Sequence, residues 1–521
     1  MSTTYGLHRA VLLNRNGTAV VFEDRRRTFA ELADRVARLA GALRNLGIAK
    51  GDRVAVLSLN QDRYIELYLG VAWAGAVIVP LNVRWSALEN EDCLRDCRPK
   101  VLVLDAAFAA VGAEIAEKIG SFKVIYADDV PMKGLPDSTP DYERLLAAAA
   151  PIPDANIPDK ELAGIFYTGG TTGRSKGVML SHHNLMSNAR NMAAELNYDE
   201  TSVYLHVAPM FHLADGAALF GYLLKGATHA VLRMFTPEGI AQAIERFRIT
   251  DVLLVPTMIQ MFVDHPGVEN YNLSSLRRVI YGASPISEAV LDRAMVRLPN
   301  AEFVQAYGMT ELSPCATYLH WKDHIGEARA KGRHRSGGRP CLMVDVRIVD
   351  AADKPVPPRT VGEIAVRGDT VMMGYWERPE ETKKAVIDGW MHTGDSGYMD
   401  EDGYVYIVDR IKDMIISGGE NVYSVEVENC IALHPAVAQC AVIGIPSERW
   451  GETVHAVVMR KPGAEVTADD IIAFCKERIA GYKCPRSVDI QDQMLPLSGA
   501  GKVLKRELRK PFWEGQSRAV N

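Results

Sequence analysis

The chain has little surplus charge and no long uninterrupted hydrophobic run. Its 59 Lys and Arg residues against 65 Asp and Glu residues give a formal net charge of -6, which argues against nucleic acid or an anionic membrane as the main partner. The longest apolar run, from Leu67 to Leu81, is interrupted by Gly70 and Gly75 and closes with Pro80. That is shorter than the roughly 20 residues of a membrane-spanning helix. We therefore expect a buried helix that leads into a buried strand.

Cysteine is scarce, and its spacing excludes the common zinc motifs. The eight cysteines form no C-x-x-C pair, and Cys93 and Cys97 have no second pair or histidine cluster to complete a site. We expect reduced, mostly structural thiols. The opening stretch, MSTTYGLHRAVLLNRNG, contains no apolar core of a secretory signal. These features predict a cytoplasmic protein.

What the chain does contain is a regular alternation of strand-like and helix-like segments. At 521 residues, 48% of them hydrophobic, it is long enough for roughly three or four folding units. In TFAELADRVARLAGALRNLG, apolar residues recur at helical spacing between Thr28, an expected cap, and Gly47, an expected stop. Short β-branched runs such as DRVAVLSL, GAVIVPLN and TDVLLVPT separate such helices. The alternation predicts α/β layers with parallel strands and ligands beyond their carboxyl ends.

The texture changes twice toward the carboxyl terminus. From about Gly338 the segments become short strands and tight turns, which predicts a β-rich unit, and after Arg410 strands and helices mix in a compact stretch. We therefore predict an α/β fold in two domains. A large N-terminal domain over residues 1–410 would consist of layered α/β subdomains and the β-rich unit. A small, mobile α+β domain would follow over residues 411–521.

One loop carries the chemistry of a polyphosphate grip. The segment YTGGTTGRSKGV, residues 167–178, combines glycines, which let backbone N–H groups approach an anion, with hydroxyl donors and a lysine. It is not the Walker pattern, because Lys176 follows Ser175 and precedes Gly177. A flexible surface loop is the alternative for this segment alone. Its phosphate-binding candidates are Thr168, Thr171, Thr172 and Lys176.

Five further motifs accompany this loop in a fixed order. They are PMFH at 209–212, YGMTE at 307–311, GWMHTGD at 389–395, DRIKDMIISGGENVYSVEVE at 409–428 and PLSGAGKVLKREL at 496–508. The set resembles the adenylate-forming superfamily, which comprises acyl- and aryl-CoA synthetases, luciferases and the adenylation domains of peptide synthetases. The resemblance covers nearly the whole chain and is strongest to bacterial fatty-acyl-CoA synthetases. It implies that a carboxylate attacks the α-phosphorus of ATP and gives an acyl-adenylate and pyrophosphate.

The resemblance also implies how ATP and Mg²⁺ would be held. The loop candidates would bind the β- and γ-phosphates, and Thr310 would contact the α-phosphate. Glu311 would ligate Mg²⁺, a hard cation that prefers oxygen ligands. The adenine and ribose contacts would come from Tyr307, from the backbone of Gly282, Ala283 and Ser284, and from Asp395 and Arg410.

For the C-terminal segment the resemblance implies a catalytic lysine and a thiol tunnel. Lys502, in the loop SGAGK, would bridge the carboxylate and the α-phosphate in the transition state. Lys412 would be the hinge about which the small domain turns between adenylation and thioester formation. Gly418 and Gly419 would line the tunnel for the pantetheine arm of coenzyme A. Trp450 would stack on the adenine of coenzyme A or pack within the small domain, two readings of equal weight.

The sequence indicates the acid substrate and its acceptor less directly than it indicates the ATP site. His212 would border the acyl pocket, where peptide-synthetase domains carry an aspartate, so an amino acid substrate is disfavoured. We expect nearby Asp215 to be a helix-start cap or a surface residue. The remaining pocket candidates are small or apolar and favour a hydrophobic monocarboxylic acid, a medium- or long-chain fatty acid first and an aryl acid second. They are Gly216, Ala217, Ala218, Gly221, Val255, Thr257, Met258, Ala306, Leu312 and Cys315.

Diffusible coenzyme A is the expected acceptor, and several alternatives stay open. An acyl carrier protein could take its place, a luciferase would share the adenylation motifs, and a non-catalytic acyl-nucleotide-binding protein would share the fold. We expect no nucleic acid partner. For the oligomeric state, a homodimer is one candidate.

Overall fold

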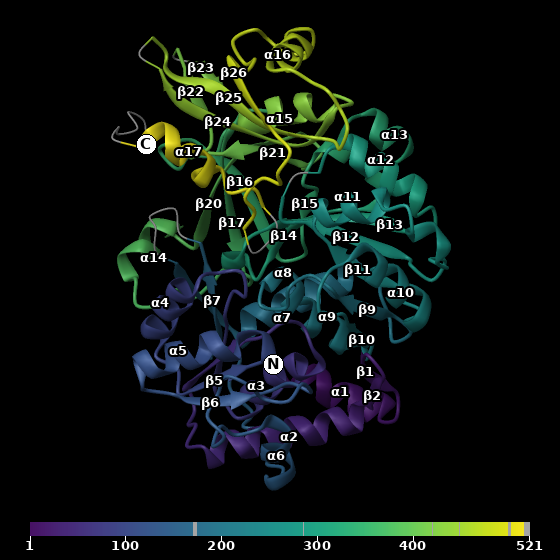
Figure 1. Cartoon of the computed structure of the whole chain (residues 1–521), viewed down its shortest axis with the longest axis vertical. Coiled ribbons are helices and arrows are strands. Elements are labelled where there is room, and N and C mark those ends of the chain that lie inside the picture. Colours follow the sequence, from purple (N-terminus) through teal and green to yellow (C-terminus); the bar gives the residue numbers. More distant parts are fainter. Residues whose placement is uncertain (170–174, 285, 419, 448, 499–501, 515–521) are drawn as a thin grey trace.

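The computed structural model describes residues 1–169, 175–284, 286–418, 420–447, 449–498 and 502–514 (Figure 1). Four β-sheets organise these residues. Within the described ranges, no helix combines the length and the hydrophobicity needed to cross a membrane.

Two large sheets form the N-terminal part, and their central strands are parallel, as predicted. The seven-stranded sheet has the order β18 (Gly374–Tyr375), β8 (Lys176–Ser181), β7 (Leu162–Thr168), β4 (Val77–Pro80), β3 (Arg53–Leu57), β5 (Val101–Leu104), β6 (Lys123–Tyr126). The nine-stranded sheet has the order β15 (Arg339–Pro340), β14 (Cys315–Leu319), β13 (Glu302–Gly308), β12 (Arg278–Gly282), β11 (Asp251–Leu254), β9 (Val203–His206), β10 (Thr228–Val231), β1 (Thr18–Phe22), β2 (Arg25–Thr28). Their edges are antiparallel, at β7–β8–β18, at β13–β14–β15 and at β1–β2.

Two smaller five-stranded sheets follow along the chain. The antiparallel one contains β16 (Val344–Val349), β17 (Gly362–Gly368), β19 (Val386–Ile387), β20 (Trp390–Met399) and β21 (Val405–Arg410). It is the β-rich unit predicted from Gly338 onward. The C-terminal one contains β22 (Ile415–Ser417), β23 (Glu420–Val422), β24 (Val437–Ser447), β25 (Gly451–Arg460) and β26 (Ser487–Gln491). The architecture is thus mixed α/β with a large N-terminal and a smaller C-terminal domain, which confirms the predicted fold class.

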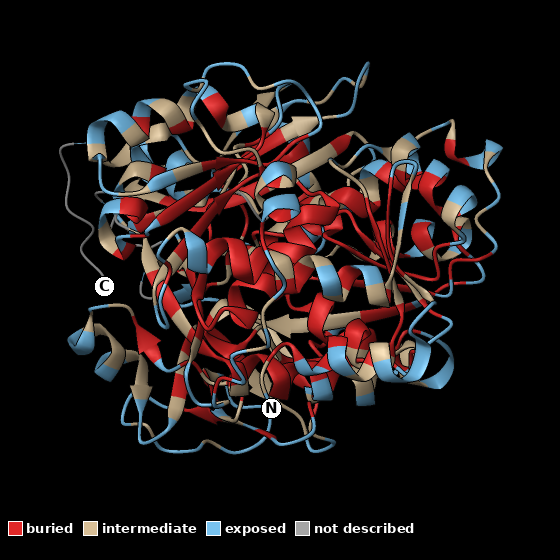
Figure 2. Ribbon diagram, turned by 90° about the horizontal axis from the view of Figure 1, so that it is seen from below, coloured by how far each residue is buried: buried red, intermediate tan, exposed pale blue. Residues whose placement is uncertain are grey.

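Helices cover the sheets, and burial concentrates in the strands and in the helix faces turned toward them (Figure 2). The helices are α1 (Tyr5–Asn14), α2 (Phe29–Asn45), α3 (Asp62–Trp73), α4 (Ala87–Cys97), α5 (Ala109–Ile119), α6 (Tyr142–Ala148), α7 (His182–Glu195), α8 (Leu213–Gly216), α9 (Ala218–Lys225), α10 (Pro237–Phe247), α11 (Pro256–Asp264), α12 (Glu288–Arg297), α13 (Gly326–Ala330), α14 (Pro379–Ala385), α15 (Ser424–Ala432), α16 (Ala468–Lys476) and α17 (Lys505–Trp513).

Local sequence explains the elements that were predicted best. Helix α2 starts at Thr28, whose side chain accepts from the Glu31 N–H while the Glu31 carboxylate accepts from the Thr28 N–H. This reciprocal capping box stabilises the first turn, and Gly47, at φ +90°, follows the helix end. Every residue of α3 is buried, and β4 follows after a short turn. The predicted buried helix and buried strand are confirmed.

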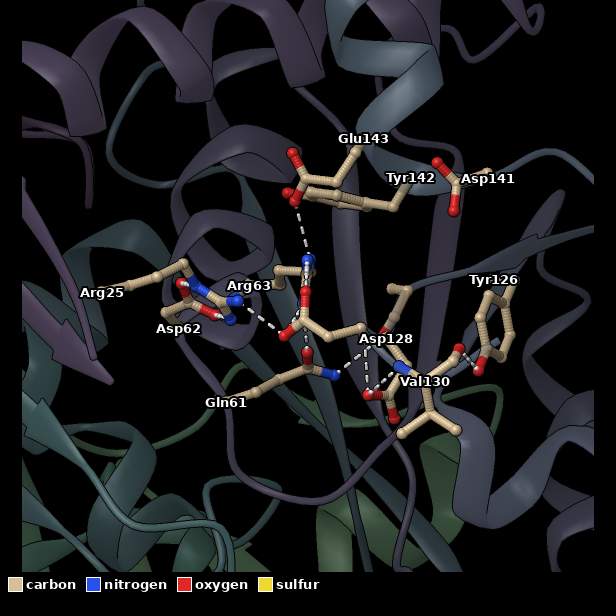
Figure 3. A network of polar contacts seen from close by, with 12 residues as sticks. Arg25, Gln61, Asp62, Arg63, Tyr126, Asp128, Val130, Asp141, Tyr142 and Glu143 are labelled. Atoms are coloured by element: carbon tan, nitrogen blue, oxygen red, sulfur yellow. Dashed lines mark hydrogen bonds and ion pairs between the residues drawn. The ribbon is translucent and has the colours of Figure 1, made fainter. Parts of the chain in front are cut away.

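A partly buried set of ion pairs, which we call the arginine cluster, ties α2, α3 and α6 to β2. Figure 3 shows the part of it around Arg25, Asp62, Arg63 and Glu143. Asp62, 1% exposed, accepts two hydrogen bonds of 3.0 Å from Arg25 and a further one from Arg27. Arg63, 2% exposed, donates to Asp129 and Glu143 at 2.7 and 2.8 Å. The cluster comprises Arg25, Arg27, Arg35, Arg63, Asp62, Glu66, Asp129 and Glu143.

Candidate active site

The phosphate-loop candidates lie at the junction of β7 and β8. Thr168 and Lys176 face each other as the last paired residues of this antiparallel pair. The Lys176 ammonium forms an ion pair with Glu381 of α14 and lies 5.0 Å from the centre of the Tyr375 ring. Thr171 and Thr172 lie outside the described residues. The described part of the loop therefore places one lysine and one threonine at the carboxyl end of β7.

The predicted adenine contacts lie at the carboxyl ends of β12 and β13. A Cβ on Gly282 would lie 2.1 Å from the Ala306 carbonyl oxygen, so only glycine allows this close approach of the two strands. Ala283 follows with φ +65°, a left-handed conformation that turns the chain out of the sheet. Ser284 and Tyr307, both partly buried, complete the group.

Asp395 links the nine-stranded sheet to the small antiparallel sheet. It is 6% exposed and lies opposite Arg410 in the β20–β21 pair. The Tyr307 hydroxyl donates to Asp395 Oδ2 at 2.8 Å, and Arg410 Nε lies 2.9 Å from Asp395 Oδ1. Arg410 itself stays 46% exposed. The three residues implied for adenine and ribose thus form one hydrogen-bonded unit.

Glu311 lies in the short turn that follows β13, directly after Thr310. It is 6% exposed, and the Tyr375 hydroxyl donates to its Oε1 at 2.9 Å. Burial raises the pKa of Glu311 above its ordinary value, opposed by this hydrogen bond and by the charges of Arg410 and Lys176. Because burial disfavours the bare carboxylate, a metal ion bound at Glu311 would offset the cost of its buried charge.

The donor set at Glu311 fits Mg²⁺ but not a metal held by protein alone. Among the described residues, no group of three or more His, Cys, Asp or Glu side chains is arranged to hold a metal ion. Mg²⁺ is commonly bound through one or two carboxylates together with substrate phosphates and water. Glu311 can supply the carboxylate, and bound ATP would have to supply phosphate oxygens.

Lys502 comes from the C-terminal domain into this group. Burial, and then the Arg410 charge, lower the pKa of Lys502 to about 8, while Asp395 and Glu311 oppose the shift. Its own N–H donates to the Ser498 hydroxyl at 3.1 Å, and its carbonyl accepts from the Ser498 N–H at 2.6 Å. The structure therefore brings the lysine predicted to be catalytic together with the predicted ribose and metal ligands.

His212, at the start of α8, lies near enough to Lys502 to feel its charge. Its Nδ1 accepts from the Ala214 N–H at 3.2 Å. Burial, followed by the charges of Lys502 and Arg84, lowers the pKa of His212 to about 4. The imidazole is therefore neutral near pH 7 and, with Nδ1 as an acceptor, carries its proton on Nε2.

Arg84 is a residue of this site that the sequence analysis missed. It follows β4, and its guanidinium donates to the Ser498 carbonyl at 3.2 Å, across from the N-terminal to the C-terminal domain. The usable signal was its position after the carboxyl end of a predicted parallel strand, where α/β sheets bind ligands. Tyr375 and Glu381 were missed as well, because their partners lie far away in sequence.

Two of the coenzyme A candidates lie beside strands of the C-terminal sheet: Gly418 follows β22, and Trp450 precedes β25. Gly418 has φ +64°, and a Cβ there would lie 2.7 Å from the Trp450 ring. Arg449 and Arg486 flank that ring at 4.6 and 4.8 Å from its centre. In this conformation Trp450 therefore packs within the small domain. Gly419 lies outside the described residues.

The predicted hinge residue follows β21. Lys412 lies two residues after Arg410, and its carbonyl oxygen is 3.5 Å from an Arg509 guanidinium nitrogen of α17. Burial, followed by the charges of Lys176 and Arg410, lowers the pKa of Lys412. The segment thus contacts the C-terminal helix and lies near enough to Lys176 to feel its charge.

The candidate acyl-pocket residues divide between core and site. Gly216 and Gly221 allow close packing, because a Cβ on either would lie 2.5 or 2.6 Å from the hydroxyl of Tyr68 or Tyr198. Ala217, Ala218 and Leu312 are buried in the core that joins the two large sheets, and Val255 and Met258 in the core beneath α10, α11 and α12. Ala306, Cys315 and Thr257 are partly buried. The partly buried members are the ones that could face a ligand.

The prediction for Asp215 was wrong. Its side chain is fully buried, accepting from the Tyr204 hydroxyl at 2.9 Å and pairing with His206 Nδ1 at 2.7 Å. His206 Nε2 in turn lies 3.0 Å from His229 Nδ1. The reason is that Asp215 is directed from α8 onto β9 and β10, a direction that a four-residue helix does not reveal in sequence.

Known proteins are similar to this chain over nearly its whole length. Residues 7–376 match the family model described as AMP-binding enzyme, and residues 426–502 match the AMP-binding enzyme C-terminal domain. A feruloyl-CoA synthase of Amycolatopsis sp is 40% identical over 509 residues, covering 97% of this chain and 98% of the relative. A fatty acid–[acyl-carrier-protein] ligase of Streptomyces coeruleorubidus is 36% identical over 507 residues, covering 96% and 95%.

A solved structure shows the same arrangement of domains. The o-succinylbenzoate coenzyme A synthetase of Bacillus subtilis, in complex with ATP and magnesium ion, superimposes with a TM-score of 0.84 at 28% identity. The match covers 96% of this chain and 98% of that chain.

Proposed function

Because the chain belongs to the AMP-binding enzyme family, we propose that it joins a hydrophobic monocarboxylic acid to coenzyme A in two ATP-dependent steps. In the first, the acid carboxylate displaces pyrophosphate from ATP and becomes an acyl-adenylate. In the second, the thiol of coenzyme A displaces AMP and forms the thioester. The observation that carries the proposal is the meeting of Lys502 with Arg410, Asp395 and Glu311.

The first step needs positive charge where two anions meet. Lys502, half-buried between His212 and Arg410, is placed to lie against a carboxylate and an α-phosphate together. A preorganised charge in such a partly water-excluded site stabilises the transition state without reorganising solvent. Thr310 would donate to the same phosphate. In this proposal the neutral His212 adds no charge of its own beside Lys502.

ATP would be held by the groups around Lys502. Lys176, Thr168, Thr171 and Thr172 would contact the β- and γ-phosphates, and Lys176 would exchange its partner Glu381 for phosphate. Tyr307 with residues 282–284 would enclose adenine. Asp395 would accept from a ribose hydroxyl while Arg410 and Tyr307 hold its carboxylate in place. Mg²⁺ at Glu311 would offset the phosphate charge.

For the acid, a medium- or long-chain fatty acid is our first candidate. The partly buried candidates Ala306 and Cys315 offer no cation for a second carboxylate, which supports an acid with an apolar body. The relative from Streptomyces is named for a fatty acid. An aryl acid is the second candidate, because the relative from Amycolatopsis is named for feruloyl-CoA.

Coenzyme A is the proposed acceptor. After rotation about Lys412, Gly418 and Gly419 would line the thiol tunnel, and Trp450 would be available to an adenine ring. The name of the Streptomyces relative makes a carrier protein the alternative acceptor. A pantetheine arm is common to both, so the acceptor has to be determined by experiment.

The deciding experiment measures pyrophosphate release that depends on ATP and Mg²⁺, with and without coenzyme A, across fatty, aryl and short-chain acids. We expect coenzyme A-dependent turnover on one hydrophobic class, with the thioester and AMP as products. Pyrophosphate release that does not depend on coenzyme A but increases with a carrier protein bearing its pantetheine arm would show that the carrier protein is the acceptor. No release with any acid would contradict the proposed function as a whole.

A further inference from the structure

Three charged side chains, Asp409 of β21, Glu428 of α15 and Lys505 of α17, lie close together next to Arg410. None of them has a part in the proposed substrate contacts. Asp409 of β21, 2% exposed, accepts from the N–H and the hydroxyl of Ser424 at 2.5 and 2.7 Å. Lys505, the first residue of α17, donates to the same hydroxyl at 2.5 Å and lies 2.7 Å from Glu428 Oε1. We call Asp409, Ser424, Glu428 and Lys505 the hinge cluster; β21, α15 and α17 can be followed in Figure 1.

The backbone joins Lys505 rigidly to Lys502. Leu497 pairs with Val503 as an antiparallel bridge, and the Leu504 N–H donates to the Pro496 carbonyl at 2.8 Å. Ser498 and Lys502 are joined by the hydrogen bonds described above. The described residues 496–498 and 502–504 are thus paired with each other, and we call them the Lys502 hairpin. Helix α17 begins at Lys505 directly after them, so the anchoring of Lys505 bears on the position of Lys502.

The cluster is short of positive charge. Its two carboxylates face one ammonium, and burial raises the pKa of both Asp409 and Glu428 while Lys505 opposes the shift. Lys505 is 13% exposed. Arg509, one turn further along α17, pairs instead with Asp413 at 3.0 Å. Loss of the Lys505 charge would therefore leave the buried Asp409 and the partly buried Glu428 without a nearby cation.

We propose that Lys505 is a positioning residue for the adenylation step, fastening the Lys502 hairpin through Ser424 and Glu428 to Asp409, next to Arg410. This inference rests on the proposed function, because it assigns a part of the two-step reaction to a residue that touches no substrate. It adds a link between the strand that carries Arg410 and the loop that carries Lys502.

The link concerns adenylation because of where it lies along the chain. Asp409 precedes Lys412, whereas Ser424, Glu428 and Lys505 follow it. If the small domain turns about Lys412, the hydrogen bonds from Ser424 to Asp409 span the turning point and belong to the conformation that holds Lys502 in the site. Loosening them disfavours this conformation relative to the other one.

The test compares the two half-reactions in Lys505→Met, Lys505→Arg and wild type. Adenylation is measured as ATP–pyrophosphate exchange with the preferred acid, and thioester formation from chemically prepared acyl-adenylate and coenzyme A. We expect Lys505→Met to slow adenylation about tenfold or more, since small misplacements of a catalytic group cost that much, and to leave the thioester step within about twofold. Lys505→Arg should restore most of the exchange rate.

Two controls keep the outcome readable. Lys510→Met changes an exposed lysine of the same helix and should alter neither rate. Ser424→Ala removes the hydroxyl shared by Asp409 and Lys505 and should act like Lys505→Met, more weakly. It also serves if Lys505→Met does not fold.

A readout without substrate separates this inference from the proposed function. Hydrogen exchange of the amides in residues 424–428 and 502–510 should quicken in Lys505→Met and not in Lys510→Met. Equal losses in both half-reactions, in step with lower thermal stability, would overturn a positioning role, as would unchanged exchange rates in both assays. If wild type forms no adenylate from any acid, the proposed function fails, and amide exchange still reports on the link itself.

Discussion

Two charge clusters in this molecule differ in their balance of charge: the arginine cluster has as many arginines as carboxylates, and the hinge cluster has more carboxylates than cations. In the arginine cluster each carboxylate contacts at least one guanidinium, and Asp62 accepts from two. In the hinge cluster two carboxylates share one lysine. The first lies wholly between residues 25 and 143, inside the N-terminal domain, whereas the second crosses the predicted hinge.

The difference is visible in the carboxyl groups. Burial by itself would raise the pKa of Asp62. The hydrogen bonds from Arg25 and the charges of Arg27 and Arg25 nevertheless hold this pKa below its ordinary value. The Arg63 hydrogen bond lowers the pKa of Asp129 to about 2. In the hinge cluster burial dominates, and the pKa values of Asp409 and Glu428 rise.

By this comparison, the arginine cluster suits a permanent joint, and the hinge cluster suits a contact that differs between the two proposed conformations. A planar guanidinium binds two carboxylates in fixed directions, whereas an ammonium is a compact charge on a flexible stem. Arginine therefore suits the joint of α2, α3 and α6, which both proposed conformations would keep. In the hinge cluster only the hydrogen bonds from Ser424 to Asp409 cross residue 412, and in the proposed cycle these bonds would form and break.

The largest expected effect lies at Lys502, the lysine that the hinge cluster is proposed to position. Lys502→Ala should reduce adenylation by at least about a hundredfold, since a preorganised charge of this kind contributes about 3–4 kcal/mol. The fold should be retained, and thioester formation from supplied acyl-adenylate should largely survive. Pyrophosphate exchange and the thioester assay measure the two steps, with the exposed Lys510→Ala as the control. A variant that adenylates at the wild-type rate would refute the role of Lys502.

The next effect tests whether the hinge cluster really spans a turning point. Lys412→Pro should spare adenylation and slow thioester formation by about a hundredfold, because a fixed φ prevents the second arrangement from being reached. Lys412→Ala removes the same side chain but leaves φ free and should keep more of the thioester rate. If both variants lose the two steps equally, the turning point lies elsewhere and the comparison loses its basis.

A change in the arginine cluster should affect stability and spare chemistry. Asp62→Asn leaves Arg25 and Arg27 short of a buried partner, which typically costs about 3–5 kcal/mol. Asp34→Asn, which removes an exposed pair with Arg38, should cost no more than about 1 kcal/mol. Urea unfolding measures both, and turnover per folded molecule should be unchanged. Equal losses in the free energy of unfolding of the two variants would show that the arginine cluster contributes no more stability than an exposed ion pair.

Sequence reasoning predicted most of the framework of the fold, because that framework is written in local patterns. The Thr28 cap, the buried α3–β4 unit and the α/β alternation are confirmed. The antiparallel edges of both large sheets were not foreseen, because pairing of β13 with β14 or β7 with β8 depends on tertiary contacts. The family resemblance, carried by ordered motifs, is confirmed by the matched family models.

The candidate site was predictable as a set of residues and not as a set of contacts. The roles given to Thr310, Lys176, Trp450 and the domain boundary at residue 410 stay predictions. Asp215 was misjudged, because burial of a lone carboxylate depends on which way a short helix faces. Lys505 was overlooked, since its partners lie 77 and 81 positions away in sequence.

The smallest effect is a pH dependence that sharpens the comparison. The pKa of Asp62 is lower in the folded protein than in the unfolded chain, so its stabilisation is fully present above the unfolded value, about 3.9. It is lost as pH falls through the folded value. The stability difference between wild type and Asp62→Asn should therefore be constant from pH 7 to about 5 and shrink below that. Urea midpoints at intervals of pH measure it, and the difference for Asp34→Asn should stay small throughout. A wild-type advantage that grew on acidification would mean that Asp62 is protonated in the folded protein at neutral pH, and the contrast between the two clusters would disappear.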